Sequence, residues 1–306
     1  MEIVAKKAID EKKPRKSVTV FAGSGRKQRG LTYAAARRFL DNLESYGDVQ
    51  GEIVFLSECS LGLCRGCKVC FERGEERCPL KGDRDMLIEK MMASDGVVFA
   101  TPTYSFQVSA IMKAFLDRLG FVFHRPRFFG KTFTSIVAQG LFGGGKIEKY
   151  LDFVGGCLGF NTVKGSCITA LEPMTEKDRR KMDKALARQC RRFHKQLIEP
   201  TLAAPSLLQL MGFRMGRTSI KQTLGEDKRD FVYYRDRDWL ESDYYYPTRL
   251  GPLKKAVGAL FDWMAARKYK RPEPAPRLIT MASAAEQAAE ENDKRPTQTT
   301  ARGDAS

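Results

Sequence analysis

The sequence predicts an α/β protein built on a doubly wound, five-stranded parallel sheet. Short β-rich runs alternate with amphipathic stretches over residues 17–199, an order typical of a parallel sheet with helices on both faces. The runs are brief and apolar, as expected of strands buried on both faces. Beyond residue 199 the alternation ends, and a helical, aromatic C-terminal extension over residues 200–271 is expected.

The strands and helices follow one another regularly. The expected strands are residues 17–22, 51–56, 96–101, 132–138 and 161–170. The expected helices are residues 31–43, 83–92, 108–121 and 148–154, and a fifth that opens at a capping box of Thr175 and Asp178. Ligands of such sheets bind beyond the carboxyl ends of the strands, so the loops after the first, third and fourth strands are the candidate site.

The remaining segments differ in composition. Within the extension, residues 230–246 are unusually aromatic, and residues 250–264 repeat apolar residues at helical spacing, with Pro252 near the helix start. Residues 1–16 form a basic tail and residues 272–306 a tail rich in proline, alanine and glutamate, and both are expected to be disordered. Residues 17–199 are the predicted ligand-binding domain.

Composition narrows the protein class. Of the 306 residues, 42% are hydrophobic, which is ordinary for a globular protein. No stretch approaches the roughly 20 apolar residues of a membrane span, and the charged first sixteen residues lack the apolar core of a secretory signal. A cytoplasmic location is expected. In that reducing compartment, the eight cysteines indicate metal or redox chemistry before disulfides.

The formal net charge of +16 does not predict nucleic-acid binding. Much of the positive charge lies at the chain ends and on one helix, over residues 177–195, rather than among aromatic base-stacking positions. A solvated helix face is the simplest interpretation. The functional alternative is a redox partner with an acidic docking face, because opposite charges steer encounter.

The first loop, residues 23–32, joins a strand to a helix. Its small residues let backbone amides turn inward, and the hydroxyls of Ser24 and Thr32 can donate to phosphate oxygens beside the positive end of the following helix. The spacing matches neither the Walker loop nor the dinucleotide motif. A purely structural turn is the alternative.

Two further loops are expected at the same edge of the sheet. In residues 101–110, Pro102 is expected to force the chain out of the sheet, which would free Tyr104 and Phe106 to frame a flat heterocycle. Residues 139–145 bring a glycine-rich backbone to the same place. The alternative is a turn with ordinary core aromatics. The ligand-binding interpretation is strengthened because such loops follow three successive strands of the sheet.

Four cysteines lie close together in the sequence. Two residues separate Cys64 from Cys67 and Cys67 from Cys70, and Cys78 follows before a proline. Three thiolates at this spacing can bind three corners of one cube, and a fourth completes a [4Fe–4S] cluster, whereas structural zinc usually takes two well-separated pairs. Arg65 and Lys68 would offset the negative charge. A reduced, thiol-rich loop is the alternative.

These motifs resemble the NADPH-dependent FMN reductases of the flavodoxin-like superfamily, and more closely its iron–sulfur flavoproteins. The resemblance covers about residues 17–170 and is carried by Gly23-Ser24-x-Arg26 with Thr32, by Thr101-Pro102-x-Tyr104 running into the segment Ser109 to Arg118, and by the triple glycine. The cysteine arrangement before Asp83-x-Asp85-Met86 also matches. One departure is Gly25, where the family usually has proline.

The resemblance implies FMN as a cofactor, with its phosphate on the first loop and its ring at the second and third. The implied FMN contacts are Ser24, Arg26, Gln28, Leu31, Thr32, Pro102, Thr103, Tyr104, Ser105, Phe106, Gln139, Gly143 and Gly144. It also implies a [4Fe–4S] cluster on Cys64, Cys67, Cys70 and Cys78.

The expected function is an FMN-dependent oxidoreductase with no catalytic acid or base. It would relay electrons between a ferredoxin-like donor, the cluster and FMN, or pass hydride from NAD(P)H through FMN to a small-molecule acceptor. A non-catalytic electron carrier or sensor is the alternative. A homo-oligomer is expected, and packing of the helix at residues 250–264 on the domain or a sister subunit is favoured over membrane-surface contact. His124 is expected in a solvated loop, and His194 in a structural position.

Overall fold

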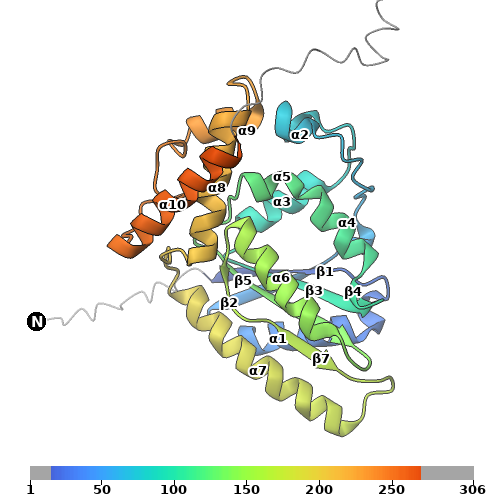
Figure 1. Cartoon of the computed structure of the whole chain (residues 1–306). Helices are drawn as coiled ribbons and strands as arrows, with labels where there is room; N and C mark the ends of the chain where they lie inside the picture. The colour runs from blue at the N-terminus through green and yellow to red at the C-terminus, as the bar shows by residue number, and fades with distance from the viewer. Residues whose placement is uncertain (1–14, 270–306) are drawn as a thin grey trace, which may run out of the picture.

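The computed structural model describes residues 15–269, with one largely parallel sheet at its centre (Figure 1). Strands β1 (Lys16–Ala22), β2 (Val49–Phe55), β3 (Gly96–Tyr104) and β5 (Thr132–Gln139) are ordered β2-β1-β3-β5, and β6 (Asn161–Thr162) and β7 (Ser166–Thr169) both pair with β5. These strands are parallel. This is the flavodoxin-like strand order, so the predicted fold class is confirmed. The predicted tails lie outside the described residues, except for Arg15 and Lys16.

Helices cover both faces of the sheet (Figure 1). On one face lie α1 (Leu31–Glu44) and α7 (Glu176–Ile198), and on the other α3 (Arg84–Ala93), α4 (Ala110–Arg118), α5 (Gly120–His124) and α6 (Gly144–Leu158). Alternate residues of β1 enter the two cores: Val18 and Val20 pack with α1 and α7, while Phe21 packs with the opposite helices. The Thr175 hydroxyl caps α7 by accepting from the Asp178 amide, as predicted.

The expected fifth strand, residues 161–170, is broken into β6 and β7. Between them, the Asp152 carboxylate accepts hydrogen bonds from the Gly165 amide at 3.1 Å and from the Ser135 hydroxyl at 2.9 Å. Burial raises the pKa of Asp152, and these hydrogen bonds oppose the rise. A Cβ at Gly165 would lie 2.2 Å from the Ser135 hydroxyl oxygen, so only glycine fits at the break.

Two other expected boundaries were wrong. Strand β3 runs past Pro102, which pairs with Ala138 of β5, and ends at Tyr104. Proline lacks only the amide donor, and its fixed φ is compatible with extended backbone, so it does not force the chain out of the sheet. The expected helix over residues 108–121 is divided into α4 and α5 at Leu119, and its first two residues belong to other structure: β4 (Gln107–Val108) and the cap Ser109.

The C-terminal extension contains α8 (Leu207–Thr223), α9 (Arg229–Arg235) and α10 (Pro252–Lys268). Its aromatic residues form a third core with Phe213, Tyr234, Trp239 and Tyr244 among its members. Phe129, on the loop before β5, packs against Trp239, Tyr245 and Tyr246 of this core. The extension therefore joins the sheet domain through aromatic contacts at the end of the sheet away from the loops predicted to bind FMN.

Helix α10 leaves most of its apolar side exposed. Leu253 is 74% exposed and Trp263 54% exposed, and within this helix only Gly258 and Ala265 are buried. Of the two arrangements expected for this stripe, packing on the sheet domain does not cover it in the single chain, and packing on a sister subunit stays a prediction. Within residues 15–269, no helix is long and apolar enough to cross a membrane.

Candidate functional site

The carboxyl ends of four strands and the segments that follow them meet in one pocket of about 300 Å3, which we call the carboxyl-edge pocket. Of the predicted FMN contacts, the structure brings together Ser24, Arg26, Leu31, Thr32, Pro102, Thr103, Tyr104 and Gln139. The predicted contacts that do not line the pocket are Gln28, Ser105, Phe106, Gly143 and Gly144. The three loops chosen from the sequence thus converge on one site.

One end of this pocket is suited to an anion. Ser24 and Thr32 are buried there, and α1 begins at Leu31. The residue that caps α1 is Gly30, which has no side chain to accept hydrogen bonds from the first-turn amides. Free amides and the helix dipole both favour negative charge at this point. This end of the pocket would therefore suit a phosphate group.

The pocket wall from β3 offers an unused hydrogen-bonding group. The Thr103 hydroxyl oxygen is buried and has no hydrogen-bond partner in the described structure, and buried polar atoms of this kind are uncommon. Tyr104 beside it is about half exposed. A polar heterocycle in the pocket would give the Thr103 hydroxyl a partner and the Tyr104 ring a surface to cover.

Beyond Tyr104 the chain makes a tight hairpin into β4. Ser105 and Phe106 are its two turn residues, and both have left-handed backbone, with φ of 48° and 59°. This conformation is costly for residues other than glycine. The hairpin presents Phe106 to solvent, where its ring lies 5.4 Å from that of Phe142. The strained turn therefore places an aromatic pair beside the carboxyl-edge pocket.

This strain can be measured. Ser105→Gly is expected to raise the free energy of unfolding by about 0.5–1 kcal/mol, because glycine adopts positive φ without steric cost. Gln107→Gly is the matched control, since Gln107 lies in β4 and glycine weakens strands. Denaturant unfolding of the two variants should give shifts of opposite sign. A loss of stability in both would show that Ser105 is not strained.

Gln139, Gly143 and Gly144 have roles within the protein. The Gln139 amide donates to the Thr169 hydroxyl at 2.7 Å and accepts from the Gly144 amide at 2.6 Å. Gly143 has a φ of 99°, and a Cβ there would lie 2.8 Å from a ring carbon of Phe106. The glycine-rich loop is therefore shaped by close packing against the neighbouring loop as well as by any ligand.

Sequence reasoning missed part of the pocket wall. Ala170, Leu171 and Glu172 line it from the loop after β7. The Glu172 carboxylate lies 2.7 Å from an Arg26 guanidinium nitrogen, and both residues line the pocket. The signal was available, because the fifth strand of a parallel sheet ends at the same edge as the others.

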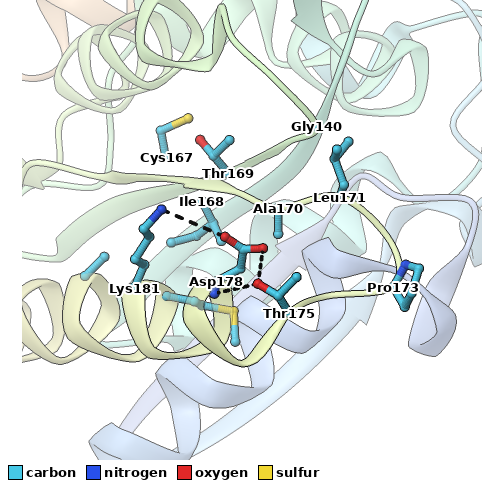
Figure 2. A pocket seen from close by; sticks show the side chains of 12 residues that line it. Gly140, Cys167, Ile168, Thr169, Ala170, Leu171, Pro173, Thr175, Asp178 and Lys181 are labelled. Carbon is cyan, nitrogen blue, oxygen red and sulfur yellow. Dashed lines mark hydrogen bonds and ion pairs between the residues drawn. The ribbon is translucent and has the colours of Figure 1, made fainter.

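A larger pocket of about 570 Å3 adjoins the carboxyl-edge pocket and shares Gly140, Ala170 and Leu171 with it. Figure 2 shows that its charged wall is formed by Asp178 between Thr175 and Lys181. The Thr175 hydroxyl donates to the Asp178 carboxylate at 2.6 Å, and the Lys181 ammonium lies 3.9 Å from it. These polar groups bind one another, and no predicted FMN contact or cluster ligand lines this pocket.

The four predicted cluster ligands line a second site, the cysteine pocket. Its wall contains Cys64, Cys67, Cys70 and Cys78, and all four are free thiols. Within residues 15–269, no three metal-ligating side chains are gathered closely enough to hold a single metal ion. A four-iron cube separates its thiolates more widely than one ion does. Four free thiols around one pocket are the donor set that such a cluster needs.

Three buried arginines hold the irregular cysteine loop by its backbone. Arg118 donates to the carbonyl oxygens of Leu61 and Leu80, Arg125 to that of Cys70 and Arg84 to that of Glu75. Each of the three guanidinium groups is at least 96% buried. The loop lacks long secondary structure of its own, and these bonds replace it.

Arg125 also connects this loop to the C-terminal extension. It is fully buried and pairs with Asp230 of α9 and with Glu75. Burial would raise the pKa of Glu75, but its own amide and the cations of Arg125 and Arg127 lower it overall. Burial raises the pKa of the Cys70 thiol, and Arg125 opposes this. Asp230 of the extension thus pairs with the arginine that binds the backbone of the cysteine loop.

The two histidines occupy defined positions. His124 is 51% exposed, but its Nδ1 lies 2.7 Å from the Asp230 carboxylate and its ring lies 4.4 Å from that of Phe71. The half-exposed side chain fits the expected solvated position, but His124 is the last residue of α5 rather than part of a loop. His194 lies 2.9 Å from the Asp48 carboxylate and stacks on Tyr46, which is the expected structural role.

Helix α4 spans the interval between the two sites. Its cap, Ser109, donates a hydrogen bond to the Gly23 carbonyl oxygen beside the carboxyl-edge pocket. Its last two residues, Asp117 and Arg118, line the cysteine pocket. The nine residues of α4 correspond to about 12 Å at 1.5 Å per residue. The cysteine loop follows β2 and so leaves the sheet at its carboxyl edge, but the cysteines lie at the far end of α4.

The sequence model of the NADPH-dependent FMN reductases matches residues 17–171. The chain belongs to this family. An iron–sulfur flavoprotein of Archaeoglobus fulgidus is 34% identical over 149 residues, 44% of this chain and 66% of the relative. An iron–sulfur flavoprotein of Methanocaldococcus jannaschii is 34% identical over 97 residues, 32% of this chain and 48% of the relative. The chain thus spans about half to two thirds of the curated relatives.

A solved structure supports the flavodoxin-like fold of this FMN reductase family member. The crystal structure of RosB with bound 8-demethyl-8-formylriboflavin-5′-phosphate has a TM-score of 0.52 at 12% identity. The match covers 86% of this chain and 97% of RosB. At this identity, the comparison concerns the fold alone.

Proposed function

We propose that this FMN reductase family member is an FMN-dependent oxidoreductase that exchanges electrons between FMN and a [4Fe–4S] cluster. The observation that carries the proposal is the structure of the two pockets: one gathers eight of the thirteen predicted FMN contacts, and the other gathers four free cysteines. When bound, FMN would accept hydride from NAD(P)H and release electrons singly or in pairs. Both a ferredoxin-like partner and a small-molecule acceptor suit this chemistry.

In the carboxyl-edge pocket, this chain would bind and orient the flavin. Ser24, Thr32 and the first turn of α1 would hold the phosphate. The buried Thr103 hydroxyl would find its missing partner on the flavin, and Tyr104 would cover one edge of the ring. The Arg26–Glu172 pair would border the site. No side chain here need act as an acid or base.

In the cysteine pocket, the four thiolates would hold the cluster. Arg65, Lys68, Arg84 and Arg118 lie in the same wall and would offset its negative charge. The relatives' names mention iron and sulfur, which supports the assignment. Without the cluster, the chain would be a plain FMN reductase with a thiol-rich loop.

The experiment that tests this function is an anaerobic visible spectrum with iron, sulfide and flavin assays. About four iron atoms per flavin and broad visible absorbance are expected. Steady-state NAD(P)H oxidation separates an enzyme from a non-catalytic carrier. Protein that binds flavin but no iron after anaerobic reconstitution would rule out the cluster. Protein that binds no flavin would rule out the whole proposal.

Ser24→Asp tests the placement of the phosphate. A carboxylate facing the phosphate should weaken FMN binding by at least a hundredfold, since like-charge contacts cost several kcal/mol. Ser24→Ala, which removes the hydroxyl without adding charge, is the control and should cost about tenfold. Flavin titration measures both dissociation constants. Equal affinity in Ser24→Asp and Ser24→Ala would place the phosphate elsewhere.

The homo-oligomer expected from the sequence stays a prediction. The exposed apolar side of α10, with Leu253, Leu260 and Trp263, is a surface that a second copy could cover. Sedimentation analysis of the intact chain measures the oligomeric state directly.

A further inference from the structure

Arg118 is a buried cation with an incomplete set of partners. Only 4% of its surface is exposed. Its terminal nitrogens donate to the carbonyl oxygens of Leu61 and Leu80, and its Nε has no hydrogen-bond partner in the described structure. Within residues 15–269, no carboxylate forms an ion pair with it. Two neutral carbonyls satisfy hydrogen bonds but do not neutralise a charge.

Neighbouring arginines are neutralised, which makes Arg118 different. Arg84 pairs with Asp85, and Arg125 pairs with Asp230 and Glu75. The carboxylate that lines the cysteine pocket, Asp117, is bound by Lys113 and is about half exposed. A buried, unpaired charge is strongly unfavourable in a protein of this kind. An anion bound next to Arg118 would supply the countercharge that the described residues do not provide.

The position of Arg118 shows where that anion belongs. Arg118 lines the cysteine pocket together with Cys64, Cys67, Cys70 and Cys78. Four thiolates around a four-iron cube carry net negative charge in both oxidation states, and one-electron reduction adds another. A fixed cation in a poorly solvated wall stabilises the more negative state more, and net charge is one determinant of cluster potentials.

We propose that Arg118 is the counter-cation of the group bound in the cysteine pocket and sets its reduction potential. This inference rests on the proposed [4Fe–4S] cluster, and it concerns a positioning residue rather than a ligand. The reduction is a one-electron step in which the cluster gains an electron from an external reductant and no bond breaks. Arg118 favours the reduced form by its charge alone.

Gly62 allows that charge to be neutralised without removing Arg118. Gly62 has a φ of 58°, and a Cβ built on it would lie 3.8 Å from Nη1 of Arg118, an ordinary contact. Asn and Asp tolerate this left-handed backbone better than other side chains. Gly62→Asp would place a carboxylate beside the guanidinium, and Gly62→Asn is a control of the same shape without charge.

The test is an anaerobic dithionite titration of reconstituted protein, followed by visible and electron paramagnetic resonance spectra. At the same applied potential, the ratio of reduced to oxidised cluster in Gly62→Asp is expected to be at least tenfold lower than in Gly62→Asn. For a one-electron couple, a tenfold change in this ratio corresponds to a reduction potential about 59 mV lower. Iron lost from Gly62→Asp alone would also support the proposal. Equal potentials at full iron content would overturn it.

A second pair of variants decides the case in which both Gly62 variants lose iron. Arg118→Lys keeps the charge, and Arg118→Gln keeps an amide donor without charge. If only Arg118→Lys retains iron or the wild-type reduction potential, the proposal is supported. If the two variants have the same iron content and the same reduction potential, the proposal is overturned. Wild-type protein that binds FMN but no iron would instead refute the proposed cluster, so the two failures are distinguishable.

Discussion

Serine in place of Cys64, Cys67, Cys70 or Cys78 is expected to abolish iron binding and the broad visible absorbance that accompanies it. Each cluster corner needs a thiolate, and a serine hydroxyl does not ionise at neutral pH. FMN should remain bound at wild-type affinity, because the carboxyl-edge pocket contains none of these four residues. Single-electron reduction should fail, while direct hydride transfer from NADPH should persist.

Cys157→Ser is the matched control for this series. Cys157 is a free, half-buried thiol on α6, outside the cysteine pocket, so its replacement should leave the iron content unchanged. Anaerobic reconstitution followed by iron and flavin assays measures all five variants. Full iron content in any one of the four serine variants would exclude that cysteine as a ligand.

Asp230→Ala is expected to produce the largest loss of stability of any substitution considered. It would leave the fully buried Arg125 without its main carboxylate partner, and breaking a buried ion pair costs about 3–5 kcal/mol. For a chain of this size that loss corresponds to a fall in melting temperature of about 10 °C. Because Arg125 also holds the Cys70 carbonyl, iron retention should fall with stability.

Asp243→Ala is the control for that prediction. Asp243 also pairs with a buried arginine, Arg214, but it is about half exposed, and Asp262 stays as a second partner. Its loss should cost no more than about 1 kcal/mol. Calorimetry of both variants tests the difference. Equal melting temperatures would show that Asp230 does not anchor the cysteine loop.

The sequence predicted well what depends on local pattern. The brief apolar runs predicted strands buried on both faces, and the order of strands and helices led to the carboxyl edge of the sheet as the candidate site. The cysteine spacing led to one pocket, because residues so near in sequence cannot lie far apart. All of these features follow from periodicity or short spacing.

Features that depend on distant partners could not be predicted. Arg125 and Asp230 are 105 residues apart, and no local pattern shows that one neutralises the other. The same holds for Arg118, whose importance comes from the lack of a carboxylate rather than from a motif. Gln139 lines the carboxyl-edge pocket as predicted, but its hydrogen bonds to Thr169 and Gly144 could not be predicted, since they depend on strand pairing and on the path of the following loop.

Helix α4 has a consequence for the rate of electron exchange. It begins beside the carboxyl-edge pocket and ends in the wall of the cysteine pocket, so one hydrogen-bonded rod fixes the interval between them. Groups held at its two ends would exchange electrons by tunnelling over a constant distance. Such an exchange is not gated by the closure of a loop or domain, and its rate should not respond to the viscosity of the solvent.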